Sequence, residues 1–333
     1  MEIAKKLRTE AGRNRLHRTR NKALLRLWGL FRLILIMGIS FVIVQPIIMK
    51  IAVAVKDKQD ILNKTIFIIP EHFTLENFKH AINVLHYFEA LGNTLSLSAV
   101  MMVLQAASCA LAGYGFARFD FKGKNLLFAF VILTILVPPQ TLMVPTYLHF
   151  RSFDFLGIIS MITGKEGVNL INTPWPSIIM AMTANGLKSG LYIYIFRQFF
   201  RGMPKEIEEA ALIDGAGGVQ SFFRIMLPNA IPPLITVMLF AFVWQYNDVF
   251  YASLLMSQST LLSTQVATMP ANANTYISLI LESAGSANAK SDPNHVAMIV
   301  DTGILLAIAP LVILYLFVQR YFVESVERTG VVG

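Results

Sequence analysis

The chain has 333 residues, of which 55% are hydrophobic and only 14% are charged. This composition is too apolar for an ordinary soluble domain, in which about 25% of residues are charged, and it excludes a disordered chain. The net charge of +8 would indicate an acidic partner in a soluble protein, so its meaning depends on where the charges lie. The single cysteine, Cys109, excludes an intramolecular disulfide, and its apolar surroundings favour a buried, inert thiol.

Six segments are long and apolar enough to predict membrane helices, which need about 20 mainly apolar residues each. They cover residues 33–54, 92–117, 126–150, 174–200, 229–256 and 296–319. We therefore predict an all-α integral membrane protein, with a six-span domain over 33–333 behind a basic segment, 1–32. The small residues around Ala54 also resemble a signal cleavage site. However, the first apolar run exceeds the roughly 7–15 residues of a signal core, which favours an uncleaved anchor.

The basic residues show a one-sided distribution. Most of the 28 Lys and Arg residues lie in segment 1–32, after the second span, between the fourth and fifth spans, and at the C-terminus. A six-span order places these segments on one side, so the positive-inside rule predicts that both termini are cytoplasmic. The net charge is then a topology signal, and nucleic acid is not expected as a partner. Segment 1–32 could also bind anionic membrane lipids.

The loop at residues 203–228 carries the most informative pattern. Pro204 followed by acidic residues is typical of a helix start, and Gly215 is expected to end this helix. Ala210 and Ala211 give the helix small residues that let another surface approach closely. The pattern alone leaves two interpretations open, a helix lying on the membrane surface and a helix that docks on a partner.

This loop resembles the EAA loop of ABC importer permeases. Glu209-Ala210-Ala211 and Asp214-Gly215-Ala216 match the motif, and the segment that ends in Leu227-Pro228 follows it. Trp244, Asn247 and Asp248 resemble the W-x-x-N-D stretch of the maltose-type sugar branch. Other stretches resemble that branch as well: residues 74–78, 93–95, 114–119, 121–124 and 319–323. The resemblance covers about residues 30–333, and the enlarged outer segments 151–173 and 257–295 depart from the family.

The resemblance implies a type I ABC importer permease in the bacterial inner membrane, carrying an oligosaccharide or related sugar. Its implied partners are a second permease subunit, an ABC ATPase dimer and an extracellular or periplasmic solute-binding protein. The residues implied to couple to the ATPase are Glu209, Ala210, Ala211, Asp214, Gly215, Ala216 and Pro228. No cofactor is expected in this chain, because ATP and Mg²⁺ would be bound by the partner ATPase.

A second group of residues is a candidate substrate path. Lys188 is expected near mid-membrane, where it could contact sugar hydroxyls, or instead snorkel or close a structural ion pair. Trp244 and Tyr246 could stack on sugar faces beside Asn247 and Asp248, although such aromatic clusters are more often packing or interfacial.

The motifs that are missing from the sequence also bear on function. No G-x-x-x-x-G-K-[ST] phosphate loop occurs, since Gly123-Lys124 and Gly164-Lys165 are followed by Asn and Glu. No cluster of His and acidic residues predicts a metal or catalytic site, so we do not expect an enzyme. A secondary, ion-coupled transporter is the alternative, but such proteins usually have repeated halves, and the EAA-like loop argues against one.

Overall fold

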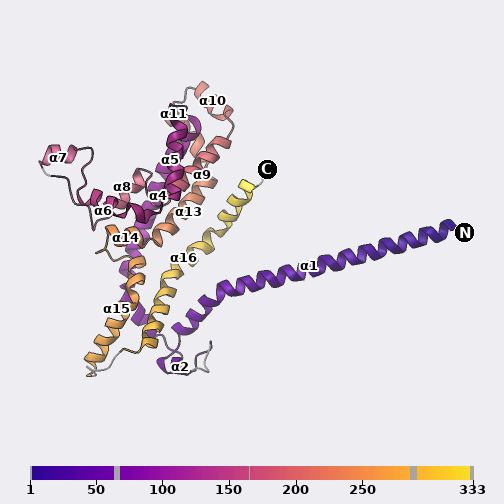
Figure 1. The fold of residues 1–333 in the computed structure, drawn as a ribbon, viewed down its shortest axis with the longest axis horizontal. Helices are drawn as coiled ribbons and strands as arrows, with labels where there is room; N and C mark the ends of the chain where they lie inside the picture. Colours follow the sequence, from indigo (N-terminus) through magenta and orange to yellow (C-terminus); the bar gives the residue numbers. More distant parts are fainter. Residues whose placement is uncertain (1, 64–67, 165, 286–290, 331–333) are drawn as a thin grey trace. The chain divides into compact units, whose positions relative to one another are not determined.

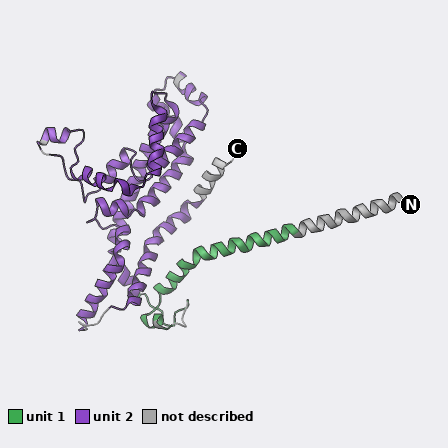
Figure 2. Cartoon of the chain, in the orientation of Figure 1, with its two compact units in different colours: residues 1–75 green, residues 76–333 purple. Residues whose placement is uncertain are grey.

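The computed structural model describes residues 2–63, 68–164, 166–285 and 291–330 (Figure 1). The chain divides into two compact units, residues 1–75 and 76–333 (Figure 2).

The first unit consists mainly of α1 (Glu2–Ala54), followed by the short α2 (Lys58–Leu62). The part of α1 from Leu24 to Ala54 is long and apolar enough to cross a membrane. Its apolar side chains are exposed, as Ile34 is at 70%, which suits a helix that faces lipid. The predicted first span, 33–54, is therefore helical, and the same helix continues back through the described part of the basic segment. An isolated antiparallel bridge pairs Lys56, just after α1, with Phe73.

The second unit is built from short and long helices around α4. They are α3 (Glu76–Leu85), α4 (Tyr87–Arg118), α5 (Lys124–Leu136), α6 (Met143–Arg151), α7 (Ile158–Thr163), α8 (Trp175–Met182), α9 (Ser189–Gly202), α10 (Glu206–Ile213), α11 (Gly218–Ser221), α12 (Leu227–Asn229), α13 (Ile231–Tyr246), α14 (Phe250–Leu255), α15 (Leu262–Ser283) and α16 (Pro293–Gly330). A 3₁₀ turn (Pro139–Leu142) precedes α6, and a π-helical turn (Phe222–Met226) follows α11.

Close helix packing holds this unit together. One buried cluster joins α4 to α9 and α13, and a second joins α3, α15 and α16. At the first contact, a Cβ added to Gly113 of α4 would lie 2.5 Å from the Cβ of Phe196 on α9. Glycine therefore sets the α4–α9 separation, as small residues commonly do between membrane helices. A Cβ at Gly303 of α16 would meet the flexible end of the Met269 side chain on α15, so this second contact depends less strictly on glycine.

The predicted count of six continuous spans is not reproduced. Among the described residues, three helices are long and apolar enough to cross a membrane: Leu24–Ala54, Tyr87–Arg118 and Pro293–Gln319. The count rises to five if each of two bent helix pairs is one span. The second and sixth predicted spans, 92–117 and 296–319, lie within the long helices α4 and α16.

The third and fifth predicted spans are interrupted. The third bends by 104° between Leu136 and Pro139, because prolines cannot donate the backbone hydrogen bonds that would continue the helix. The fifth is preceded by an 81° bend between Asn229 and Ile231. It stops at Tyr246, so the predicted continuous helix over 229–256 is wrong in its last part.

The fourth predicted span, 174–200, is also not one helix. α8 ends at Met182 and α9 begins at Ser189, and both Ala184 and Lys188 between them have positive φ values, 55° and 62°. Positive φ is unfavourable for residues with a side chain, so this break is held by surrounding contacts.

The outer segment 257–295 contains a helix that the sequence analysis did not identify. α15 has 22 residues, many of them polar. Several of its hydroxyls donate to carbonyls one turn back in the same helix, as Thr275 does to Ala271 at 3.1 Å and Ser278 to Asn274 at 2.9 Å. These bonds satisfy polar side chains locally, which is why a polar composition did not prevent a helix here.

Candidate functional site

The loop at 203–228 folds as the sequence predicts at both ends of its first helix. α10 has three acidic residues in its first turn, where they complement the positive end of the helix dipole. At its other end, Gly215 has φ +85°, and the N–H of Ala216 donates to the carbonyl of Ala211 at 2.9 Å. This six-residue bond with glycine in the left-handed conformation is a Schellman C-cap.

One acidic residue of α10 points back into the protein. Oε1 of Glu208 accepts a hydrogen bond from the hydroxyl of Tyr114 on α4 at 2.5 Å. Its Oε2 lies 3.3 Å from Nε of Arg118, whose side chain is only 5% exposed. The same guanidinium donates from Nη2 to the carbonyl of Met203 at 2.9 Å. Glu208 therefore fastens α10 to the end of α4 by two side-chain contacts.

The second half of the loop is fastened by aromatic packing. The ring of Tyr114 lies 5.6 Å from that of Phe200 and 5.0 Å from that of Phe222, centroid to centroid. Phe200 lies in the last turn of α9 and Phe222 opens the π-helical turn, and both are buried. Tyr114 thus contacts both sides of the loop at once.

The sequence analysis did not select Glu208, Tyr114 or Arg118 as site residues. It noted Tyr114 and Arg118 only as part of a stretch that resembles the sugar branch. The sequence did offer one signal: Tyr114 and Arg118 are four residues apart, which places them on one face of a helix.

The residues implied to couple to a partner lie mostly on the outer side of the loop. Glu209, Ala210, Asp214, Gly215 and Pro228 are exposed. Ala211 is buried and Ala216 is half-buried, so these two support the loop from within. Two large apolar side chains, Ile213 at 86% and Val219 at 75% exposure, add to the outer surface. An exposed face of acidic, small and apolar residues suits contact with another protein.

The candidate path residues fall into two groups. Lys188 and Trp244 lie together, with Nζ of the lysine 4.7 Å from the centre of the indole ring. Lys188 precedes α9 at the break, rather than lying within a continuous helix, and Trp244 is 45% exposed on α13. Asn247 is also exposed, and its amide donates to the carbonyl of Val243 in its own helix at 2.8 Å.

The other two candidates have structural partners. Tyr246 is buried, and its hydroxyl donates to the carbonyl of Ala307 on α16 at 2.8 Å. Asp248 is buried, and its carboxylate accepts from the backbone N–H of Tyr251 at 3.1 Å at the start of α14. The structure does not place either side chain on an exposed surface with Lys188 and Trp244.

A cleft with a mixed polar and apolar lining, which the sequence analysis missed, lies beside α4. It has a volume of about 530 Å³, and its polar lining residues include Glu89, Asn93, Ser96, Gln258 and Ser259. Asn93 also donates to the carbonyl of Thr260 at 3.0 Å, which ties the loop after α14 to α4.

No metal site was expected from the sequence, but three potential ligands gather in the first unit. Asp60, Glu71 and His72 each offer one ligand atom, and these atoms lie within 4.8 Å of one another. Nδ1 of His72 lies 2.8 Å from Oδ1 of Asp60, so these two side chains already contact each other directly and form an ion pair when His72 is protonated.

Comparisons with known proteins agree with the loop and the helices around it. Residues 107–328 match the family of binding-protein-dependent transport system inner membrane components. The arabinooligosaccharides transport system permease protein AraQ of Halalkalibacterium halodurans is 28% identical over 298 residues, which cover 89% of this chain and 93% of AraQ.

Two solved structures share the fold. One is a bacterial ABC transporter involved in the import of the acidic polysaccharide alginate, with a TM-score of 0.68 at 21% identity, covering 89% of this chain and 97% of its counterpart. The other is a bacterial alginate ABC transporter in complex with a pentasaccharide-bound periplasmic protein, with a TM-score of 0.58 at 18% identity, covering 90% and 97%. The chain belongs to the family of binding-protein-dependent transport system inner membrane components.

Proposed function

We propose that this chain is a permease subunit of an ATP-driven ABC importer for an oligosaccharide or related sugar, forming half of the translocation path. The observation that carries the proposal is the loop at 203–228. Its helix α10 is fastened to α4 through Glu208, while Glu209, Ala210 and Asp214 remain exposed. A helix that is held on one side and open on the other can dock on a partner and pass its movement into the membrane helices.

The energy source of the proposed importer is a separate ABC ATPase dimer, which binds ATP and Mg²⁺. This chain supplies the docking surface and the mechanical link. When the ATPase displaces α10, the contacts of Glu208 with Tyr114 and Arg118 transfer that displacement to α4. Because α4 packs along α9 and α13, the same displacement reaches Lys188, which directly precedes α9, and Trp244 on α13.

The remaining partners in the proposal are a second, different permease subunit and an extracellular or periplasmic binding protein that delivers the sugar. Support comes from the family description and from the relatives, one named for arabinooligosaccharides and another crystallised with a sugar-bound periplasmic protein.

For the substrate path we propose Lys188, Trp244 and Asn247. A lysine above an indole ring and an exposed amide provide a stacking surface and hydrogen-bond donors, which are the groups that sugars use. The direct partners of Tyr246 and Asp248 favour a supporting role for those two residues.

Both termini and the loop at 203–228 are proposed to face the cytoplasm, because the basic residues gather in those segments. An N-terminal tag should be cleaved by added protease in inside-out vesicles and protected in right-side-out vesicles. The reverse pattern would overturn this orientation.

The coupling assignment is tested by reconstituting the permease in lipid with its ATPase, second permease and binding protein. Replacing Glu209 by Ala together with Gly215→Pro removes an exposed acid and a left-handed turn that proline cannot adopt. We expect assembly of the membrane subunits but at least a tenfold loss of sugar-stimulated ATP hydrolysis. Glu282→Ala, an exposed acid on α15, is the matched control. Unchanged stimulation in the double variant would reject the loop as the coupling site.

A further inference from the structure

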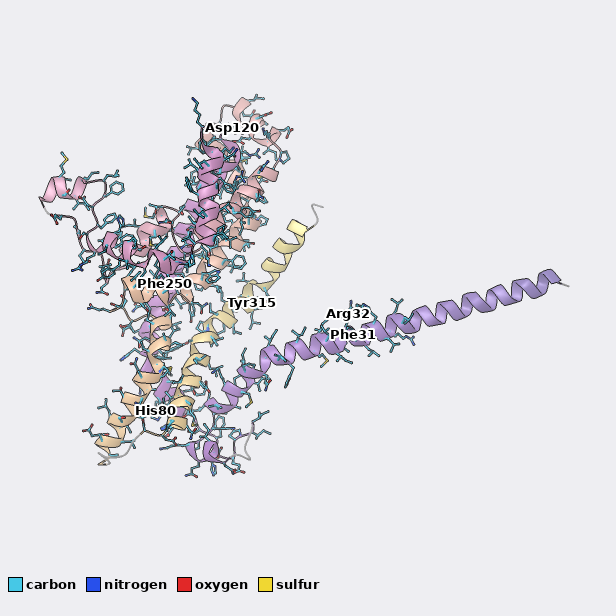
Figure 3. The ribbon with its side chains drawn as sticks, in the orientation of Figure 1. Phe31, Arg32, His80, Asp120, Phe250 and Tyr315 are labelled. Carbon is cyan, nitrogen blue, oxygen red and sulfur yellow. The ribbon has the colours of Figure 1, made fainter. Side chains whose placement is uncertain are left out.

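A basic pocket lies at the end of the bundle that carries the loop at 203–228. It is formed between the α4–α5 connection and α9, and has a volume of about 450 Å³. The charged residues in its lining are Asp120, Lys124, Arg197 and Arg201. Figure 3 labels Asp120 at this end, where Figure 1 places α10 and α11.

The positive charge of this pocket is not balanced by its neighbours. Asp120 lies 3.1 Å from Nζ of Lys124, four residues along the chain, and so compensates that lysine. Arg197 and Arg201 are one turn apart on α9, and neither belongs to an ion pair among the described residues. Two like charges at this spacing repel each other, so an anion between them would stabilise both.

The position of Arg197 is fixed by packing. Its guanidinium carbon lies 3.8 Å from the centre of the Phe128 ring on α5, a cation–π contact. Its Nε is buried and has no hydrogen-bond partner within the described structure. A buried donor without a partner is costly, so this guanidinium has hydrogen-bonding capacity that the described residues do not satisfy.

The start of α5 adds backbone donors to the same pocket. Gly123, which precedes the helix, provides no side-chain cap, and it lines the pocket together with Asn125 and Leu126. Free amides in a first helical turn favour a phosphate or another anion. Arginine forks and helix amides together suit a phosphate group better than a carboxylate, because phosphate offers more acceptor oxygens.

The surroundings indicate where that phosphate comes from. Leu126, Phe130 and Leu133 follow one face of α5 at helical spacing and are exposed at 62%, 54% and 49%. This apolar stripe begins at the pocket and continues along a helix of a membrane protein. Basic pockets beside membrane helices typically bind the head groups of anionic lipids.

We propose that this pocket binds the phosphate of an anionic phospholipid, with Arg197 and Arg201 as its main ligands and the acyl chains lying along α5. The inference uses the membrane setting of the family and does not depend on the transported substrate. A bound lipid at this place would brace the α4–α5 connection, which is next to the Arg118 anchor of α10.

The test is native mass spectrometry of the full-length protein, taken from nanodiscs that contain equal amounts of phosphatidylglycerol and phosphatidylcholine. The wild type should retain phosphatidylglycerol preferentially, and Arg197→Gln with Arg201→Gln should lower that retention about tenfold. Because Arg201 is exposed, Arg201→Gln alone should fold normally and lose retention several-fold. Lys79→Gln with Arg151→Gln removes the same charge from exposed positions outside the pocket and should leave retention unchanged.

Two competition arms separate other occupants. Inorganic phosphate and soluble glycerol phosphate should displace the lipid only weakly, because they cannot contact the apolar stripe. Displacement at low concentration would assign the pocket to free phosphate and overturn the lipid proposal. Equal retention in the wild type and the double arginine variant would also overturn it. Loss of ATPase binding in that variant, with lipid retention intact, would instead assign the arginines to a protein interface.

Discussion

Glu208 of α10 accepts a hydrogen bond of 2.5 Å from the hydroxyl of Tyr114 on α4, 94 positions earlier in the chain. The neighbouring Glu209 is exposed. Two adjacent carboxylates therefore differ in their surroundings: Glu208 contacts α4, whereas Glu209 is exposed and, in the proposed function, available to a partner. In the proposed function, Glu208 therefore determines how firmly the loop is attached to α4, and Glu209 belongs to the surface on which the partner docks.

Removing the anchor should uncouple the loop without removing its outer surface. Glu208→Ala leaves the buried guanidinium of Arg118 and the hydroxyl of Tyr114 without their partner, at a cost of ~1–3 kcal/mol for each group left unsatisfied. We expect the ATPase still to bind, but sugar-stimulated hydrolysis and uptake to fall together. The measurement is ATPase co-purification alongside uptake in proteoliposomes.

Two variants sharpen this prediction. Glu208→Gln keeps an acceptor for Tyr114 but loses the ion pair, so it should lie between wild type and Glu208→Ala. Glu209→Ala alone leaves the anchor intact and should weaken ATPase binding first. If Glu208→Ala weakened ATPase binding as much as Glu209→Ala but left uptake per bound ATPase unchanged, the anchor role would be rejected.

The α4–α9 contact should be highly sensitive to residue size at Gly113. A Cβ there would meet the Cβ of Phe196 at 2.5 Å and the backbone N of Arg197 at 3.0 Å, and neither backbone can shift without moving a helix. Gly113→Ala is expected to destabilise the protein by ~1–3 kcal/mol through overpacking. Gly92→Ala on the same helix meets no atom within 4 Å and is the matched control. Thermal unfolding in detergent compares them, and equal midpoints would contradict the packing account.

The pair Lys188 and Trp244 should show measurable coupling. A cation–π contact at an exposed site contributes about 0.5–1 kcal/mol to the free energy of unfolding. A double-mutant cycle of Lys188→Met and Trp244→Leu, with the free energy of unfolding measured for each variant, should therefore give a coupling energy in that range. If these side chains line the path, each single variant should also raise the sugar concentration needed for half-maximal uptake. Normal uptake and normal assembly in Lys188→Met would remove the lysine from the proposed path.

The sequence located the loop and both ends of α10 because those signals are local. Acidic residues after Pro204 and the glycine at 215 act on the backbone within a few residues of themselves. The Glu208–Tyr114 contact could not be predicted in the same way, since nothing nearby in the chain reports which of three acidic residues turns inward.

The helical breaks were harder to predict for a related reason. Composition identifies apolar segments, but it does not say whether a proline or a positive φ residue will interrupt them. The prolines at 138 and 139 gave a visible signal, whereas Lys188 gave none, because its left-handed conformation depends on contacts made by the folded protein. α15 was missed because its polar residues bond within their own helix.

The Asp60–His72 pair predicts how the stability of residues 56–63 and 68–75 depends on pH. The carboxylate of Asp60 accepts from the N–H of His72 at 2.9 Å and lies 2.8 Å from Nδ1 of the same residue. Desolvation opposes the charge of Asp60, but the hydrogen bonds from His72 prevail and lower the pKa of that carboxyl. The bond to Asp60 and its charge raise the pKa of His72 above its ordinary 6.5.

Stabilisation by this pair should therefore be lost at two ends of the pH range. As pH rises through the raised pKa of His72, the imidazolium loses its proton and its attraction to Asp60. As pH falls through the lowered pKa of Asp60, the carboxylate is neutralised, so stabilisation is greatest between the two values. Hydrogen exchange of the amides in 56–63 and 68–75, corrected for the intrinsic rate at each pH, should show maximal protection inside that window. His72→Gln, which can still donate from its amide but carries no charge, should abolish the decline on the alkaline side and keep the decline on the acidic side. An alkaline decline that persisted in His72→Gln would show that another group controls this segment.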